Sequence, residues 1–300
     1  MIPDTTIDEI HTLFKRHAVQ EEVIRMQRLA GTTSSLVLKL ETRQGNTYIL
    51  KRDDPQEIAA VEHFLHTYRD SALLPKVLFT AADNSYFAYS FIEGTTHFNR
   101  GAKKDWMALL AKELFNRYVR YEGPDLPGLP EYSQQSWQAF NAEGVEAAKS
   151  HIGHLLPDED YLLVRSKVDK CFARPIQPEE KFLLHGDTGV HNFVFDRSAV
   201  IGVIDPAPMV APLIYDVLYA FCSSPDDIDE ETLYAAVDLL EQGRIDRSQL
   251  VEQVLIQLYC RFGLCVKHHP HDLPGYRKAW EEWRELCMRL DSGQNPESVK

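Results

Sequence analysis

The feature that most constrains this chain of 300 residues is one polar stretch set between apolar runs. It reads His185-Gly186-Asp187-Thr188-Gly189-Val190-His191-Asn192, and the apolar run 200–204 that comes after it ends in Asp205. The apolar segment 193–195 lies between the two, so 193–195 and 200–204 are predicted to pair as a β-hairpin. Such a hairpin would hold Asn192 and Asp205 at adjacent strand ends.

The side chains in this stretch suit phosphoryl transfer from ATP. An acceptor hydroxyl is a poor nucleophile, so a positioned carboxylate must accept its proton, and Asp187 is the candidate for that role. The amide oxygen of Asn192 and the carboxylate of Asp205 are hard oxygen ligands of the kind that Mg²⁺ takes. Pro206 is expected to hold Asp205 in an extended backbone conformation. A surface or capping role is the alternative for each acid, but the spacing HGDxxxxN before an apolar strand that ends in Ile-Asp is specific.

The composition indicates a globular chain with enough apolar residues for one large domain or two lobes. Hydrophobic residues make up 44% of the sequence, which is sufficient for a sizeable core. The formal net charge is −13, so the surface should repel nucleic acid and anionic lipid. The acidity is compatible with a cationic small substrate, although acidity of this degree is also common among soluble proteins.

The cysteines and the first residues of the chain indicate the cellular compartment. The five cysteines form no CxxC pair, which favours reduced thiols over disulfides in a chain of this length. The first residues lack a basic region followed by an apolar stretch, and no apolar run approaches the ~20 residues that span a bilayer. We therefore expect a cytoplasmic protein that has no membrane segment.

The order of the expected elements divides the chain into a β-rich part and a helical part. Thr6 and Glu9 form a capping-box pattern before a short amphipathic helix. The predicted strands are 26–29, 35–40, 47–51, 87–92, 182–184, 193–195 and 200–204. The predicted longer helices are 58–65, 106–118, 213–222, 233–241, 250–267 and 276–290, and the segment 123–130 is predicted to be a loop. We expect an N-lobe over residues 1–92 and a C-lobe over residues 93–300.

The motifs resemble the signature of a known family. HGDTGVHN with IGVIDP, and then Tyr215-Asp216 on the following helix, are similar to the pattern of the aminoglycoside phosphotransferase and choline kinase-like family, which is related to the protein kinases. The order of elements matches that family over roughly residues 20–290. The resemblance implies an α+β, bilobal protein-kinase-like fold. The family often carries a Gly-Asp-Pro element where this chain reads Val210-Ala211-Pro212.

The resemblance also implies roles for the residues of the catalytic loop. Asp187 would be the catalytic base, and Asn192 and Asp205 would bind Mg²⁺. His185 and Asp216 would support the loop. A helix-surface acid is the alternative for Asp216, but its apolar neighbours place it on a buried helix, where an unpaired acid would be costly.

Further residues in the N-lobe correspond to the family's nucleotide site. Lys51, at the end of a strand, resembles the lysine that contacts the ATP phosphates, and Glu57 on the next helix resembles the acid that orients it. Glu62 is the competing choice. An exposed lysine at a strand end is an ordinary alternative for Lys51.

Two segments would complete nucleotide binding. Ser34 and Ser35 follow Gly31 where a phosphate-covering loop belongs, although one glycine is a weak signal for such a loop. Ser90 to Ile92 fall where the family's hinge offers backbone groups to adenine, and their side chains have a pure core role as the alternative.

The function expected from these features is ATP- and Mg²⁺-dependent phosphotransfer to a hydroxyl of a small molecule. Candidate acceptors are a cationic aminoglycoside, an amino alcohol or a sugar derivative. A pseudokinase or nucleotide-binding scaffold is the alternative, and a protein kinase is disfavoured because only ten residues separate Asp205 from Tyr215. The resemblance places the acceptor against the C-terminal helices, including Tyr259, His268, Trp280, Glu281, Trp283 and Glu285. A solvated helix face is the alternative for the glutamates, and a core role is the alternative for the two tryptophans.

Overall fold

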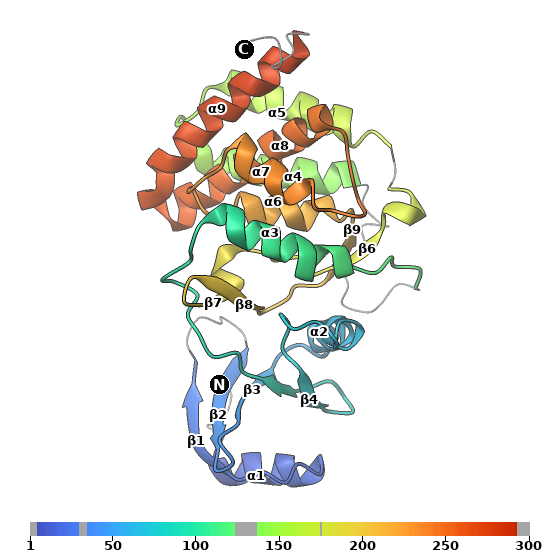
Figure 1. Ribbon diagram of the computed structural model, residues 1–300, viewed down its shortest axis with the longest axis vertical. Coiled ribbons are helices and arrows are strands. Elements are labelled where there is room, and N and C mark those ends of the chain that lie inside the picture. The colour runs from blue at the N-terminus through green and yellow to red at the C-terminus, as the bar shows by residue number, and fades with distance from the viewer. Residues whose placement is uncertain (1–4, 30–34, 124–136, 175, 293–300) are drawn as a thin grey trace.

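The computed structural model describes residues 5–29, 35–123, 137–174 and 176–292. A sheet of strands occupies one end of the long axis, and a mass of helices occupies the other (Figure 1). The fold is α+β and protein-kinase-like, as predicted. Ser34 and most of the predicted loop, 124–130, lie outside the described residues.

The N-terminal part is one antiparallel sheet whose strand order is β1-β2-β3-β5-β4. Its strands are β1 Val23–Arg28, β2 Leu36–Thr42, β3 Thr47–Arg52, β4 Val77–Thr80 and β5 Phe87–Ser90. The helix α1, Ile7–Arg16, packs on β1, and α2, Pro55–Thr67, follows β3 and contacts β4. The short strand β4 was not predicted, because its four residues lack strict alternation and it forms only by pairing with β5.

Local sequence rules explain most of this part. Alternate residues of β2, Leu36, Leu38 and Leu40, are buried because successive strand side chains point to opposite faces. The capping box predicted for α1 is present, since the Thr6 hydroxyl accepts from the Glu9 N–H and the Glu9 carboxylate accepts from the Thr6 N–H.

The C-terminal part is mainly helical. Its helices are α3 Lys103–Glu113, α4 Trp137–Ile152, α5 Asp158–Cys171, α6 Ile214–Phe221, α7 Glu230–Val237, α8 Arg247–His268 and α9 Leu273–Asp291. Two small sheets lie at the end that faces the N-terminal sheet (Figure 1), and they pair β6 Phe182–Leu184 with β9 Met209–Ala211 and β7 Phe193–Asp196 with β8 Ala199–Val203. The predicted β7–β8 hairpin is confirmed, whereas the three-residue strand β9 was not predicted. Among the described helices, none has the length and the apolar composition that crossing a bilayer requires.

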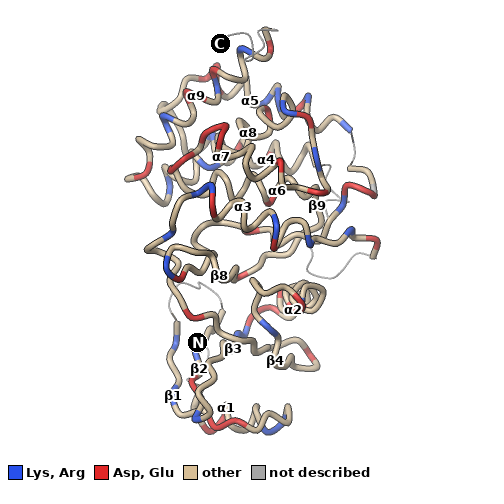
Figure 2. The backbone as a smooth tube through the Cα atoms, in the orientation of Figure 1, with Lys and Arg blue, Asp and Glu red and all other residues tan. Residues whose placement is uncertain are grey.

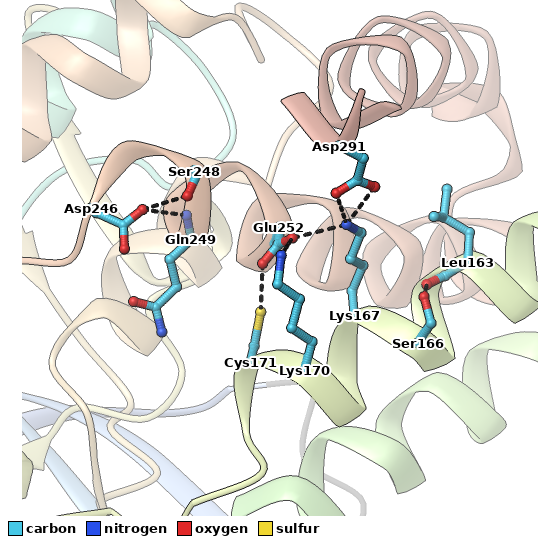
Figure 3. Close-up of polar contacts among 10 residues, drawn as sticks. All are labelled: Leu163, Ser166, Lys167, Lys170, Cys171, Asp246, Ser248, Gln249, Glu252 and Asp291. Carbon is cyan, nitrogen blue, oxygen red and sulfur yellow. Dashed lines mark hydrogen bonds and ion pairs between the residues drawn. The ribbon is translucent and has the colours of Figure 1, made fainter. Parts of the chain in front are cut away.

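A network of buried charges joins three of these helices (Figure 3). Lys167 of α5 donates to Glu252 of α8 at 2.9 Å and to Asp291 of α9 at 2.7 Å. Lys170 and the thiol of Cys171 also donate to Glu252. Both charges of the central pair, Lys167 and Glu252, are almost fully buried, so each depends on its partner.

The chain passes from the sheet to α3 along β7. Thr95 and Phe195 exchange two backbone hydrogen bonds, of 3.0 and 2.8 Å. A Cβ on Gly94 would lie 2.5 Å from Val194 and 2.7 Å from the Phe195 carbonyl oxygen, so this close passage requires glycine. The predicted division between residues 92 and 93 falls in this connecting segment.

Candidate active site

A cavity of about 310 Å³ lies between the N-terminal sheet and the segment that follows β8. Lys51, Glu57, Asp187 and Asp205 of the predicted site line it together, whereas Asn192, Ser35, Ser90 and Ile92 are not among its lining residues. The lining residues are Lys51, Asp53, Glu57, Ile58, Ala60, Val61, Phe87, Asp187, Asp205, Pro206, Ala207 and Pro208.

His185 is fully buried at the base of the loop. Its Nδ1 accepts from the Asp187 N–H at 3.3 Å, and its Nε2 lies 3.2 Å from the Ile204 carbonyl oxygen, to which it donates. These two contacts require the tautomer that carries its proton on Nε2. Burial lowers the pKa of His185 to about 4, so the ring is neutral and positions Asp187 without adding a charge.

Asp216 holds the same loop from α6. Its carboxylate accepts from the backbone N–H groups of His185 at 2.9 Å and Gly186 at 3.1 Å, and from the Tyr118 hydroxyl at 2.6 Å. The Thr188 hydroxyl donates to the Asp216 carbonyl oxygen at 2.7 Å. Burial raises the pKa of Asp216 to about 7, although the hydrogen bonds oppose that shift. The helix-surface alternative for Asp216 is thereby excluded.

Gly186 allows the loop to pass beneath the segment after β8. Its φ is +81°, and a Cβ there would lie 1.9 Å from the Ala207 carbonyl oxygen. The Ala207 N–H donates to the His185 carbonyl at 2.9 Å, so the two segments are held in backbone contact. Only glycine fits this position.

Asp187 and Asn192 face one another across the loop. The Asn192 amide nitrogen donates to the Asp187 carbonyl oxygen and to its Oδ2, both at 3.0 Å. Both amide hydrogens are then in use, which leaves the Asn192 oxygen as the group able to take a cation. His191 Nε2 lies 3.4 Å from the same Oδ2.

The second oxygen of Asp187 differs from the first in its contacts. Oδ1 is buried and has no hydrogen-bond partner among the described residues. Burial acts to raise the pKa of Asp187, but the hydrogen bond and charge of His191, with contributions from His185 and Tyr219, outweigh it, so the pKa lies below its usual value. The carboxylate is therefore ionised and has one free lone-pair oxygen.

Asp205 follows β8, but its backbone differs from the prediction. Its φ is +54°, so the expectation of an extended Asp205 before Pro206 was wrong. The Ile204 N–H donates to the Asn192 carbonyl and the Ala207 N–H donates to the His185 carbonyl, both at 2.9 Å. The chain must turn sharply between these two bonds, and aspartate is one of the residues that adopt the left-handed region more readily.

Lys51 connects the sheet to this turn. Its Nζ lies 3.5 Å from Asp205 Oδ1 and 3.3 Å from Asp53 Oδ2. In the described part of the chain the carboxylates on Lys51 are these two, and neither Glu57 nor Glu62 lies within ion-pair distance. Glu57 does line the cavity, so it faces the space that a nucleotide would fill.

In the predicted hinge, Ser90 uses its hydrogen-bonding groups within the described protein, whereas the backbone of Ile92 does not. Ser90 uses its N–H and its hydroxyl oxygen on the backbone of Lys76, both at 2.8 Å. Ile92 packs on β8, where a Cβ on Gly202 would lie 2.6 Å from its side chain. Its backbone makes no hydrogen bond to any residue that the structure describes. Ser35, at the edge of β2, is buried.

The oxygen donors of Asn192 and Asp205 could supply part of a Mg²⁺ coordination shell. Asn192 and Asp205 offer one amide oxygen and a carboxylate that is 59% exposed, and the Lys51 ammonium already lies where a cation meets Asp205. The described residues contain no group of three His, Cys, Asp or Glu side chains that would hold a metal alone. Two oxygen donors are compatible with Mg²⁺, which takes one or two protein ligands and completes its shell with phosphates and water.

Most of the residues of the C-terminal helices that were expected to contact the acceptor lie in the core or along another depression. Tyr259, Trp280 and Trp283 are buried in the core, and the indole N–H groups donate to Asp160 and to the Ile228 carbonyl. Glu281 and Glu285 line a different depression, along α9. The core alternative is therefore correct for both tryptophans.

Comparison with protein-family models identifies the chain. The model described as the phosphotransferase enzyme family matches residues 25–249. The chain belongs to this family. The match runs from β1 through the catalytic loop to the first turn of α8. A search of the curated proteins found no match.

Three solved structures show the same fold. APH(2")-IIia in its GDP and kanamycin complex is 15% identical, with a TM-score of 0.57 over 95% of this chain and 99% of that one. Amicoumacin kinase hAmiN, in complex with AMP-PNP, Ca²⁺ and Ami, is 13% identical, with a TM-score of 0.56 over 93% and 97%. Choline kinase LicA from Streptococcus pneumoniae is 13% identical, with a TM-score of 0.56 over 92% and 98%. Identities this low show the fold alone, and the named substrates are those of the other proteins.

The sequence analysis missed two residues that contact the loop. Tyr118, whose hydroxyl donates to Asp216, is separated from it by almost a hundred residues and has no motif. Tyr219 interacts with Asp187, and burial raises its pKa to about 12. A signal for Tyr219 was present, because it lies three residues after Asp216 on one helix and so on nearly the same face.

Proposed function

We propose that this chain transfers the γ-phosphoryl group of ATP to a hydroxyl of a small molecule in a Mg²⁺-dependent reaction. The observation that carries the proposal is the Oδ1 of Asp187. It is ionised, buried and without a partner among the described residues, and Asp187 lines one cavity with Lys51 and Asp205. A site with a base, a phosphate-binding cation and metal ligands is what phosphoryl transfer requires.

In this mechanism Asp187 orients the acceptor hydroxyl and takes its proton as the new O–P bond forms. The hydrogen bonds from Asn192 and the contact with His191 fix the other carboxylate oxygen, so Oδ1 has one orientation. His185 and Asp216 keep the loop rigid, which lowers the entropic cost of aligning the reacting atoms.

Nucleotide binding is assigned to the N-lobe, residues 1–92, and the chemistry to the C-lobe, residues 93–300. Lys51 contacts the phosphates, with Glu57 beside it, and Ser34 and Ser35 belong to the loop that covers them. The backbone of Ile92, next to Ser90, receives the adenine. Asn192 and Asp205 would hold Mg²⁺, whose charge neutralises the developing negative charge on the phosphates.

The segment after Asp205 favours a small acceptor over a polypeptide. Residues 209–211 form β9, which pairs with β6 over three residues. Val210 and Ala211 thus belong to a strand, and Pro212 follows its end. A stretch used in this way does not form an extended surface for a substrate chain.

The test compares Asp187→Asn with the parent and with Asp196→Asn, a control at the exposed end of β7. ADP release from MgATP is followed with aminoglycosides, amino alcohols and sugars as acceptors. We expect Asp187→Asn to lower the rate by about 10²- to 10⁴-fold, because the general base is lost. MgATP should still raise the melting temperature of the variant.

Two outcomes would contradict the proposal. An Asp187→Asn protein that releases ADP as fast as the parent would remove Asp187 from the chemistry. A parent that MgATP stabilises but that releases no ADP with any acceptor would indicate a nucleotide-binding scaffold.

A further inference from the structure

A cation lies near Asp187 that the proposed chemistry does not use. Arg261, in the middle of α8, has its guanidinium carbon 5.3 Å from the centre of the Tyr219 ring. Tyr219 interacts with Asp187 as well, and both charges act on its hydroxyl. Ser223 also links Arg261 to the loop of Asp187, because its hydroxyl oxygen accepts from the Val190 N–H at 3.0 Å and its carbonyl oxygen accepts from Arg261 at 3.2 Å.

The partners of Arg261 are neutral. Its Nη2 donates to the Ser223 carbonyl oxygen at 3.2 Å, and its guanidinium interacts with the Tyr276 hydroxyl. Its Nε is buried without an acceptor, and no carboxylate of the described residues lies within 4.0 Å of the group. A guanidinium with unfilled donors in a partly buried position favours a ligand that brings negative charge.

Lys167, the buried cation that joins α5, α8 and α9, differs from Arg261 in having acidic partners. Lys167 is held by two carboxylates, those of Glu252 and Asp291 (Figure 3). Figure 2 shows acidic residues spread widely over the backbone of this chain, which carries a net charge of −13. In such a chain, an arginine with no carboxylate of the described residues within 4.0 Å can take an external anion as its partner.

Three aromatic rings, of Phe140, Tyr215 and Tyr219, form a row that ends beside Arg261. Phe140 of α4 lies 5.9 Å from Tyr215 of α6, and Tyr215 lies 5.9 Å from Tyr219, measured between ring centres. Tyr215 and Tyr219 are four residues apart and so lie on one face of the helix. This aromatic face can pack against the carbon skeleton of an acceptor that reaches from Asp187 to Arg261.

From this arrangement we propose that Arg261 binds an anionic group, carboxylate or phosphate, on the acceptor whose hydroxyl meets Asp187. The proposal rests on the proposed transfer to a hydroxyl and narrows its substrate class. The planar guanidinium matches the two oxygens of a carboxylate or phosphate, which gives orientation as well as charge. A polycationic acceptor would place ammonium groups against Arg261, so the expectation of a cationic aminoglycoside is replaced by a hydroxylated acid or a phosphorylated sugar.

The experiment uses acceptors that share one carbon skeleton: gluconate, glucose 6-phosphate, glucose and glucosamine. ADP release and the shift in melting temperature are measured for each, in the presence of MgATP. We expect gluconate or glucose 6-phosphate to exceed glucose, and glucosamine to be poorest. The comparison of gluconate with glucose 6-phosphate shows whether a carboxylate or a phosphate is the preferred anion.

Two variants then assign the preference to Arg261. Arg261→Met should raise KM for the preferred anionic probe roughly 10- to 100-fold, the effect of losing a charged hydrogen bond, and should raise KM for glucose by a smaller factor. Arg261→Lys keeps the charge and should recover part of the loss. Arg277→Met is the matched control, because Arg277 also lies over a ring, that of Phe262, and donates to a carbonyl, that of Leu155.

The outcomes separate this inference from the proposed function. If the parent favours glucose or glucosamine, or if no anionic probe shifts its melting temperature or releases ADP faster than glucose does, the inference is overturned while transfer to a hydroxyl can still stand. If Arg261→Met and Arg261→Lys lose activity equally on all probes, Arg261 has only a structural role. If the parent binds MgATP but releases ADP with none of a broad acceptor panel, the proposed function itself fails.

Discussion

His185, in the loop before β7, and Asp216, on α6, are buried titratable groups whose pKa values move in opposite directions. Burial lowers the pKa of His185 from 6.5 to about 4, so its stabilising contribution is present above pH 6.5 and is lost as the pH falls toward 4. Burial raises the pKa of Asp216 from 3.8 to about 7, so its contribution is present below pH 3.8 and is lost as the pH rises through 7. Between about pH 4 and 6.5 the two effects oppose each other.

Replacing one of these two groups should reveal how the other makes the unfolding free energy depend on pH. In His185→Leu the unfolding free energy should fall as the pH rises from 4.5 to 6.5, because Asp216 alone remains. In Asp216→Asn it should rise over the same range, and each slope approaches about 1.4 kcal/mol per pH unit. Urea unfolding at pH 4.5, 5.5 and 6.5 measures both slopes.

The parent is the control for this pair of variants, since the two contributions should nearly cancel in it. Slopes of the same sign in His185→Leu and Asp216→Asn would show that the two pKa shifts do not oppose each other. A slope that both variants share with the parent would belong to other groups.

Secondary-structure elements were predicted well where their own sequence contains the signal. The helix α1 has its capping box, and β6, with bounds 182–184, agrees with the predicted strand. The strands β4 and β9 were missed because each has only three or four residues and exists through pairing with a neighbour. Such strands form by tertiary contact rather than by local propensity.

The contacts between helices also lie beyond local sequence signals. Glu252 of α8 is buried against Lys167 of α5 and also meets Lys170. Burial acts to raise the pKa of Glu252, but the two lysines outweigh it, and the pKa lies below its usual value. The ionised pair therefore joins helices that are more than eighty residues apart in the sequence.

At the level of elements we predict that Glu252→Gln lowers the unfolding free energy by about 3 kcal/mol, because it leaves the buried Lys167 with less compensation. ADP release should be unchanged, since the network lies outside the catalytic cavity. The matched control is Glu231→Gln, which breaks the exposed pair with Lys104 and should cost less than about 1 kcal/mol.

A double variant tests the cause of that loss. Lys167→Met with Glu252→Met should be more stable than Glu252→Gln, because no unpaired charge stays buried. Equal losses in Glu252→Gln and Glu231→Gln, measured by urea unfolding, would show that the buried pair contributes no more than an exposed one.

At the level of the whole molecule, the cavity proposed to bind the nucleotide depends on two parts of the chain that meet through Lys51. This residue of the N-terminal sheet reaches Asp205, which follows β8 in the helical part. The connecting segment runs between them, bonded to β7 at Thr95. Ligands that bind across such a boundary stabilise the folded state by mass action.

Lys51→Met should weaken MgATP binding about 10- to 100-fold, the size expected for a lost charge-assisted hydrogen bond to phosphate. The melting-temperature shift produced by MgATP measures this effect. The melting temperature without nucleotide should also fall, because Lys51→Met leaves the mostly buried carboxylate of Asp53 without its cation. Lys278→Met on the exposed side of α9 is the control, and a MgATP shift as large in Lys51→Met as in the parent would remove Lys51 from the nucleotide site.

The sequence by itself determined the local chemistry: the loop from His185 to Asn192, the hairpin after it, and the closeness of Asn192 to the end of β8. A short loop and a tight hairpin leave the covalent chain few alternatives, so spacing alone predicts which side chains share one place. Only the tertiary structure decided that Lys51 meets Asp53 and Asp205 and that Arg261 lies over the ring of Tyr219. These contacts join segments far apart in the chain, and packing of whole elements, which no local pattern encodes, brings them together.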